Sequence, residues 1–247
     1  MFSIFRKELR AFFSNATGYI AVGIFLLLMS LFLWVIPGEY NILDAGYANA
    51  DGLFYLAPWL FLFLCPAVSM RLFAEEKQTG TWETIATKPI SYLDIVIGKY
   101  LAAWLLVVIA LIPGIIYYIS VSYLAEPQGN VDSGAFWGSY AGLFLLSAIY
   151  VSIGTFTSSL SSNQIVSFVV AVVLSFSFYY GFEVLASFFQ SGKIIQLLEN
   201  AGIHAHYKSM SRGVIDSRDL VYFGFTTIAF LSLTVWKIKK KQRNLGA

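Results

Sequence analysis

The sequence predicts an all-α membrane protein, a polytopic bundle of six transmembrane helices. Only 12% of the 247 residues are charged, whereas a soluble domain usually carries about twice that fraction. Six apolar runs are each long enough to cross a hydrocarbon core of about 30 Å at about 1.5 Å per residue. The runs are 18–36, 53–70, 101–124, 136–157, 165–185 and 220–236. The whole chain, 1–247, is therefore predicted to be a single membrane domain.

Residues 2–13, before the first run, have an amphipathic pattern. The apolar residues recur at helical spacing: Phe2, Phe5, Leu9, Phe12 and Phe13. Three basic residues fall between them: Arg6, Lys7 and Arg10. The pattern predicts a helix in the membrane interface, with its basic face toward anionic headgroups. A simple basic flank of the first span is the alternative.

Prolines lie inside two of the predicted spans. Pro58 and Pro66 are in the second, and Pro113-Gly114 is in the middle of the third. A proline removes a backbone donor and crowds the preceding turn. Both spans are therefore expected to bend, and Pro58, Pro66, Pro113 and Gly114 are predicted hinges.

The placement of Lys and Arg predicts the orientation. With six spans, both termini lie on one side of the membrane. The N-terminal segment, the segment between the second and third runs, and the C-terminal tail hold three, four and five basic residues. The opposite side holds four, all in the loop 187–219: Lys193, Lys208, Arg212 and Arg218. By the positive-inside rule, the termini and the segment between the second and third runs are predicted to be cytoplasmic. The expected location is the cell's inner (cytoplasmic) membrane.

The polar segment 74–91 (AEEKQTGTWETIATKPIS) joins the second and third runs. Gly80 is expected to break a helix that extends the second run, and Thr81 to be the N-cap of a short helix with Glu83 in its first turn. That helix should end by Lys88, because the residue before Pro89 is pushed out of helical geometry. These signals fit a short rigid rod between two breaks, and they fit a solvated connector equally well.

Downstream of Pro89, Ser91 and Asp94 have the spacing of a capping box. The third helix is therefore expected to begin at this point.

Three pieces of the central segment carry a family resemblance. Glu75-Glu76, Gly80-Thr81-Trp82-Glu83 and Lys88-Pro89-Ile90-Ser91 resemble the cytoplasmic loop of ABC-2-type transporter permeases. In that family the loop carries a coupling helix that docks on a nucleotide-binding subunit. The interface that this resemblance implies consists of Glu75, Glu76, Gly80, Thr81, Trp82, Glu83, Lys88 and Pro89.

The layout is similar to that family as well. An amphipathic helix before the first span, six spans and a long external loop before the sixth all have counterparts here. The resemblance implies a cytoplasmic ABC ATPase subunit and a second permease as partners. It also implies that ATP and Mg²⁺ bind to the ATPase and that this chain binds no cofactor.

A finer resemblance links three further stretches to gliding-motility-associated permeases of the same family. They are GYIAVGIFLLLMSLFLWV from Gly18, GNVDSG from Gly129 and HAHYKSMSRGVIDSRDLVYF from His204. This resemblance implies an exporter-like complex connected with surface gliding or an associated secretion system. The transported substrate and its direction do not follow from it.

The chain lacks a nucleotide-binding signature. Gly98-Lys99 is followed by Tyr100 and lacks the earlier glycine of G-x-x-x-x-G-K-[ST]. We therefore expect a transporter subunit that is not an enzyme, with ATP hydrolysis in a separate partner. Nucleic-acid binding is not expected, because the basic residues cluster next to membrane ends.

Three ionisable residues on the predicted external side could in principle carry chemistry: His204, His206 and Glu183. His204 and His206 lack a third ligand nearby in the sequence and are expected to be solvated, with no metal site. Glu183 is expected to be an interfacial carboxylate that pairs with Lys193; a proton or substrate contact is the alternative. Two other functions remain open: an ion-coupled secondary carrier and a non-transporting scaffold for a motility or secretion machine.

Overall fold

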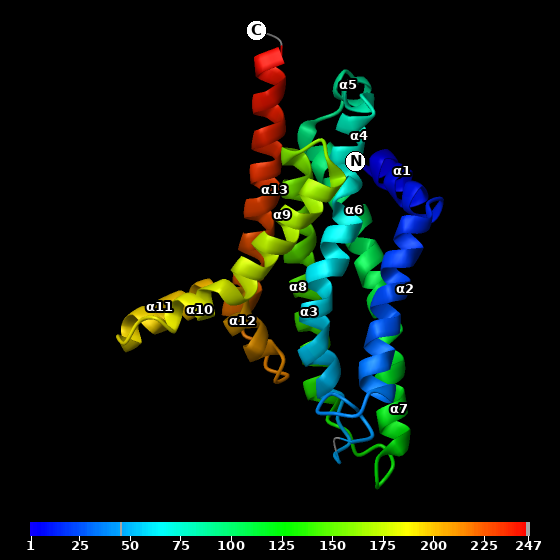
Figure 1. Ribbon diagram of the computed structural model, residues 1–247, viewed down its shortest axis with the longest axis vertical. Helices are drawn as coiled ribbons and strands as arrows, with labels where there is room; N and C mark the ends of the chain where they lie inside the picture. The colour runs from blue at the N-terminus through cyan, green and yellow to red at the C-terminus, as the bar shows by residue number, and fades with distance from the viewer. Residues whose placement is uncertain (45, 246–247) are drawn as a thin grey trace.

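The computed structural model describes residues 1–44 and 46–245. Within them it is helical without strands, and six helices are long and apolar enough to cross a membrane (Figure 1). They span Ala16–Val35, Asp51–Gln78, Tyr92–Leu124, Ser133–Leu160, Gln164–Ala186 and Ser217–Lys240. The predicted fold class, an all-α polytopic bundle, is confirmed.

Several of the six are built from shorter elements. In chain order the elements are α1 (Phe2–Phe13), α2 (Ala16–Ser30), η1 (Leu31–Val35), α3 (Asp51–Ser69), α4 (Arg71–Gln78), α5 (Thr81–Ala86), α6 (Tyr92–Leu111), α7 (Gly114–Leu124), α8 (Ser133–Leu160), α9 (Gln164–Phe176), η2 (Ser177–Gly181), α10 (Phe182–Ala186), α11 (Gly192–Ala201), α12 (Ile203–Met210) and α13 (Ser217–Leu245). The two η elements are single turns of π-helix.

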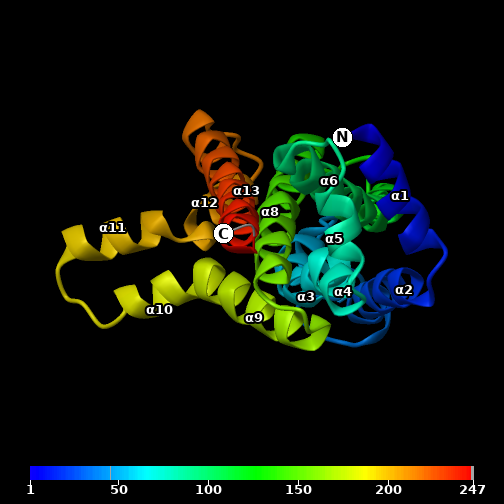
Figure 2. The same ribbon diagram turned by 90° about the horizontal axis from the view of Figure 1, so that it is seen from above.

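Helix α8 is the centre of the bundle and packs against α3, α4, α6, α9, α12 and α13 (Figure 2). Small residues allow its neighbours to approach closely. A Cβ added at Gly154 would lie 1.8 Å from the Oγ of Ser69 on α3, and one added at Gly142 would lie 3.1 Å from the Cβ of Met210 on α12. Close packing over small residues is the usual way in which helices associate in a membrane.

The proline-containing spans differ from each other. α3 continues through Pro58 and Pro66 and gives way to α4 only at Met70. The third span is interrupted by a turn at Ile112–Pro113, and α7 begins at Gly114. Movement at these four predicted hinge positions stays a prediction.

The third helix begins earlier than the apolar run suggests. Its N-cap is Ser91, whose Oγ accepts from the Asp94 amide at 3.1 Å and donates to the Asp94 carboxylate at 2.8 Å. Residues 92–100, which precede the apolar run 101–124, are therefore part of α6.

Residues 187–219, expected to be a long polar loop, are largely helical. α10 and α11 form an arm that projects away from the bundle (Figures 1 and 2). α12 folds back onto α8 and α13. It buries Ile203, Tyr207 and Met210, which share one face, and the Tyr207 hydroxyl donates to the Phe54 carbonyl of α3 at 2.7 Å. That apolar face fixes α12 as part of the bundle.

Candidate functional site

The short helix α5 lies at one end of the molecule, beyond α4 and α6 (Figure 1). Gly80 separates it from α4 and adopts a left-handed conformation, with φ of 73°. Gly80 is the N-cap residue, so the prediction that Thr81 fills that position is wrong: Thr81 is the first residue inside the helix. The reversal of direction occurs where glycine is least strained.

The predicted interface residues divide into inward and outward groups. Trp82 is buried and its ring packs edge-on against Phe73 with the centroids 5.7 Å apart; Glu76 is also buried. Glu75 is half-buried and accepts from the Arg71 guanidinium at 2.9 Å. The exposed members are Gly80, Thr81, Glu83, Lys88 and Pro89, together with Thr84, which was not predicted. The exposed group and the 40% exposed side chain of Glu75 are available for direct contact with another protein.

Four charged residues form a cluster between α1, α4 and α6: Lys7, Glu8, Glu76 and Lys99, called the charge cluster below. Glu8, Glu76 and Lys99 are buried, whereas Lys7 is exposed. The Lys99 ammonium lies 2.8 Å from both the Glu8 and the Glu76 carboxylates, and it donates to the Leu72 carbonyl at 2.7 Å. The Lys99 side chain is 1% exposed. The cluster thus joins α1, α4 and α6 with two positive and two negative groups, as buried charges require.

Lys7 lies at the open edge of the charge cluster and donates to the Glu76 carboxylate at 2.7 Å. Burial of its ammonium acts to lower the pKa, but the hydrogen bond to Glu76 and the charges of Glu76 and Glu8 outweigh burial. The pKa of Lys7 is therefore raised above its ordinary value. A small cavity of about 190 Å³ adjoins the cluster between α1 and α4.

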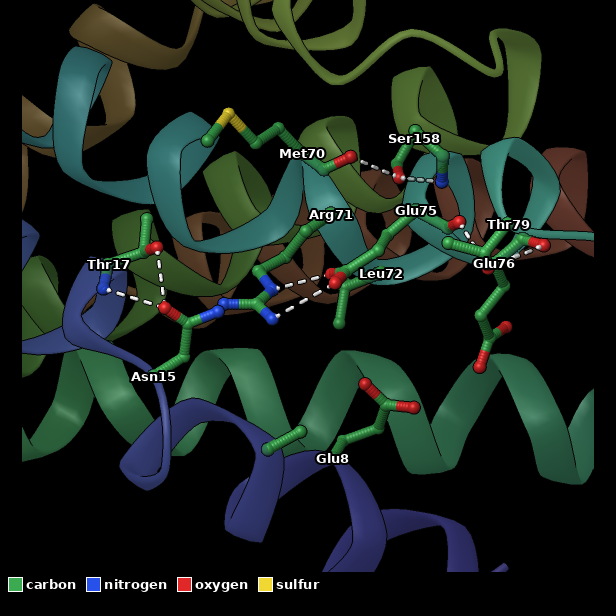
Figure 3. Close-up of polar contacts among 12 residues, drawn as sticks. Glu8, Asn15, Thr17, Met70, Arg71, Leu72, Glu75, Glu76, Thr79 and Ser158 are labelled. Carbon is green, nitrogen blue, oxygen red and sulfur yellow. Dashed lines mark hydrogen bonds and ion pairs between the residues drawn. The ribbon is translucent and has the colours of Figure 1, made fainter. Parts of the chain in front are cut away.

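Ser158 of α8 secures the junction between α3 and α4 (Figure 3). The interruption at Met70 leaves amide groups of α4's first turn without helical partners. The Ser158 hydroxyl accepts from the amides of Phe73 and Ala74 at 3.0 and 3.1 Å and donates to the Met70 carbonyl at 2.7 Å. The Lys77 ammonium donates to the Ser159 carbonyl one residue further along α8. α4 is therefore anchored to the central helix.

Helix α1 is packed against the protein more extensively than an interfacial helix needs to be. Its Glu8 and Phe12 are buried, and a Cβ added at Gly98 of α6 would lie 3.0 Å from the Met1 carbonyl. The Arg71 guanidinium stacks over the Phe12 ring at 5.5 Å. α1 therefore packs against α4 and α6 through Glu8 and Phe12, while Arg6, Lys7 and Arg10 stay exposed.

The charge cluster was not predicted from the sequence, where Lys99 is one of the basic residues on the predicted cytoplasmic side and Glu8 has no assigned partner. A signal was present, because a lysine inside an apolar helix needs a partner. The identity of that partner depends on how α1 packs.

The two histidines of α12 are paired rather than freely solvated. The His206 Nδ1 lies 2.7 Å from the Asp219 carboxylate, and its ring stacks on Tyr222 with the centroids 3.9 Å apart. The His204 Nδ1 lies 2.6 Å from the Glu183 carboxylate. The partner of Glu183 is therefore His204, and the predicted pairing with Lys193 is not found. The described residues contain no group of three or more His, Cys, Asp or Glu side chains arranged to hold a metal ion.

Residues 41–198 match the sequence profile of a family described as ABC-2 family transporter protein. The match covers more than half of the chain and runs from the loop before α3 into α11, so it contains α4 and α5. No curated protein sequence matches the chain.

Proposed function

The chain belongs to the ABC-2 family of transporter proteins, and from this premise we propose that it is the permease subunit of an ATP-driven, exporter-like ABC transporter. Membership makes it a multi-pass membrane protein that serves in transport. ATP hydrolysis belongs to a separate cytoplasmic subunit in this proposal. The observation that supports this proposal most directly is that α5 has an exposed face and packs on α4, which is itself anchored to α8, α1 and α6.

The coupling mechanism follows from how α5 is attached. An ATPase that contacts Thr81, Glu83 and Lys88 applies force to α5, and Trp82 passes that force to Phe73 of α4. Ser158 and the charge cluster connect α4 with α8, α1 and α6. A displacement of α5 therefore reaches the second, third and fourth spans together. Glu76 and Trp82 act inside the permease in this scheme, as positioning residues.

Sidedness and partners extend the proposal. The basic residues favour cytoplasmic termini and a location in the inner membrane. A second permease, identical or related, completes the transport pathway. The resemblance of the stretches from Gly18, Gly129 and His204 to gliding-motility permeases favours a role in gliding or an associated secretion system.

Co-purification in mild detergent tests the central claim. We expect an ATPase to co-purify, and the Glu83→Ala variant to lose stimulation of ATP hydrolysis or to lose the ATPase itself. Glu83 is exposed, so its truncation leaves the fold intact. Glu39→Ala, an equally exposed carboxylate in the loop before α3, is the matched control and should behave as wild type.

Two results would contradict the proposal. One is wild-type coupling in the Glu83→Ala variant. The other is a stable permease that transports in response to an ion gradient with no ATPase attached, which would favour the secondary carrier.

A further inference from the structure

A cavity of about 390 Å³ lies far from α5, between the first turns of α3, the π-turn η2 and α12. Its volume is within the range of about 300–1,000 Å³ typical of small-molecule sites. A smaller pocket of about 100 Å³ shares Tyr179, His204 and Lys208 with it and extends it toward Glu183 and Glu199. Together they form a recess lined by α3, η2 and α12, called the outer cavity below.

Aromatic rings form the walls of the outer cavity. The Trp59 ring meets Tyr179 edge-on with the centroids 5.8 Å apart, and Tyr55 and Tyr207 also line the space. Two features hold the walls in place: the hydrogen bond from Tyr207 to the Phe54 carbonyl at 2.7 Å and the burial of Tyr179. Trp59 is 40% exposed. The site therefore offers a preformed apolar surface that is open to a ligand.

Cationic groups stand at the edge of this aromatic wall. Lys208 and Arg212 both line the outer cavity and are exposed. Within residues 1–44 and 46–245, neither makes an ion pair with a carboxylate. Two cations without a partner beside an apolar cavity favour a ligand that brings the anion.

In the larger space, one carboxylate stands against these two cations. Asp51 lines it together with Lys208 and Arg212, and the hydrogen bond that Asp51 accepts from the Asn49 amide at 3.0 Å does not remove its charge. Glu183 and Glu199 line the smaller pocket, which Lys208 shares, and Glu183 lies against His204 at 2.6 Å. Because neither of these two carboxylates lines the larger space, that space keeps an excess of positive charge.

We propose that the larger space of the outer cavity binds an anionic amphiphile, a molecule with a phosphate or carboxylate head and an apolar tail. The head is held by Lys208 and Arg212, and the tail lies along Trp59 and Tyr179. A lipid headgroup and a free phosphate share this head chemistry, but only the amphiphile also uses the aromatic wall. The inference goes beyond the coupling role of α5 and does not depend on it.

Calorimetric titration of the full chain in nanodiscs of zwitterionic lipid tests the proposal, without any ATPase present. Three soluble probes separate the contributions: dihexanoyl phosphatidic acid, dihexanoyl phosphatidylcholine and inorganic phosphate. We expect saturable binding of the phosphatidic acid, weaker binding of the other two, and weakening by added salt.

The variant Lys208→Gln/Arg212→Gln removes both cations, and its affinity for the phosphatidic acid should fall by about tenfold or more, because charge-assisted hydrogen bonds are lost. Lys193→Gln/Arg218→Gln is the matched control. It removes the same charge from two exposed residues of the same region that do not line the cavity, and it should bind as wild type.

Four results would overturn the proposal. They are the absence of saturable binding, equal binding of inorganic phosphate, equal binding of the phosphatidylcholine, and equal losses in the two double variants. None of them bears on whether an ATPase couples through α5. Conversely, wild-type coupling in the Glu83→Ala variant would contradict the proposed function and would leave the result of this titration unaffected.

Discussion

A single ammonium group, that of Lys99, connects three helices near α5. It contacts the carboxylates of Glu8 and Glu76 at 2.8 Å each and the Leu72 carbonyl at 2.7 Å. A buried ion pair is often no more stabilising than apolar residues of the same size, but the loss of one partner leaves an uncompensated charge. The charge cluster therefore acts chiefly to fix how α1, α4 and α6 meet.

Replacing Lys99 with methionine tests this role. The Lys99→Met change leaves two buried carboxylates with Lys7 as their only cation, and we expect a loss of stability of about 3–5 kcal/mol. Thermal unfolding of the purified permease in one detergent provides the measurement. Adding Glu76→Gln to Lys99→Met should recover part of the loss, since it removes one of the stranded charges.

Lys7→Met is the control variant, because Lys7 lies at the exposed edge of the cluster whereas Lys99 is buried. The Lys7 side chain is 56% exposed, so its removal should cost only about 1 kcal/mol. Because the pKa of Lys7 is raised, its contribution is fully present below its ordinary value of 10.5 and is lost only as the pH rises through the higher folded value. The comparison is therefore made near pH 7. Equal, small losses for Lys7→Met and Lys99→Met would show that the cluster is not buried as described.

Gly154 tests the closeness of α8 and α3. In the Gly154→Ala variant the new Cβ would lie 1.8 Å from the Ser69 Oγ and 2.8 Å from its Cβ, so the two helices must separate. Overpacking of this kind costs about 1–3 kcal/mol, which a thermal unfolding experiment measures. Gly23→Ala, with no atom within 4 Å of the added Cβ, should be neutral or slightly stabilising, because alanine favours a helix interior over glycine. A Gly154→Ala variant as stable as Gly23→Ala would contradict the packing.

At the scale of elements, breaker residues predict α5 well but do not predict which way its side chains point. Gly80 and Pro89 locate the short helix from sequence alone, because both restrict the backbone locally. The inward turn of Trp82 depends on Phe73, and the placement of Glu8 beside Lys99 depends on contacts 91 residues apart. Such pairings follow from how the helices pack, which local patterns do not contain.

Helix α12 shows a signal that was present but masked. Ile203, Tyr207 and Met210 have the spacing of one apolar helical face. Two histidines and Lys208 lie between them in the sequence and make the average composition polar, which suggested a loop. The helical spacing of these apolar residues, rather than the average composition of the segment, indicates the helix.

The left-handed turn at Gly80 controls the direction of α5. Its φ is 73° and no atom lies within 4 Å of an added Cβ, so Gly80→Ala introduces backbone strain alone, of about 1–2 kcal/mol. We expect α5 to be displaced and ATPase coupling to fall, while stability falls by no more than this strain of about 1–2 kcal/mol. Gly80→Asn should retain more coupling, because asparagine tolerates this conformation better.

Gly192→Ala is the control for glycine loss in general, since Gly192 has open space around it and starts α11. The measurement is stimulation of the co-purified ATPase by each variant. If the Ala and Asn variants of Gly80 stimulated the ATPase to the same extent, the left-handed conformation of the turn would not be what positions α5.

At the scale of the whole molecule, α5 and the outer cavity lie toward opposite ends of the second span. α5 follows α4, whereas the cavity is lined by the first turns of α3 (Figure 1). α5, the N-terminus and the C-terminal end of α13 lie toward one end. The loops before α3 and after α7 lie at the other end. Because long helices α3, α6 and α8 run between them, a movement imposed on α5 has a direct structural route toward the outer cavity.

This arrangement predicts a defined sidedness that cysteine labelling measures. The chain has one cysteine, Cys65, and it is buried, so wild-type protein should react little with a membrane-impermeant maleimide. We introduce Thr84→Cys on α5 and, separately, Asn130→Cys in the loop after α7; both positions are exposed. Thr84→Cys should label only in inverted vesicles and Asn130→Cys only in intact cells, because basic residues flank the first position and acidic residues the second. Reversed labelling would contradict the inferred orientation, and labelling of both from one side would mean that the third span does not cross the membrane.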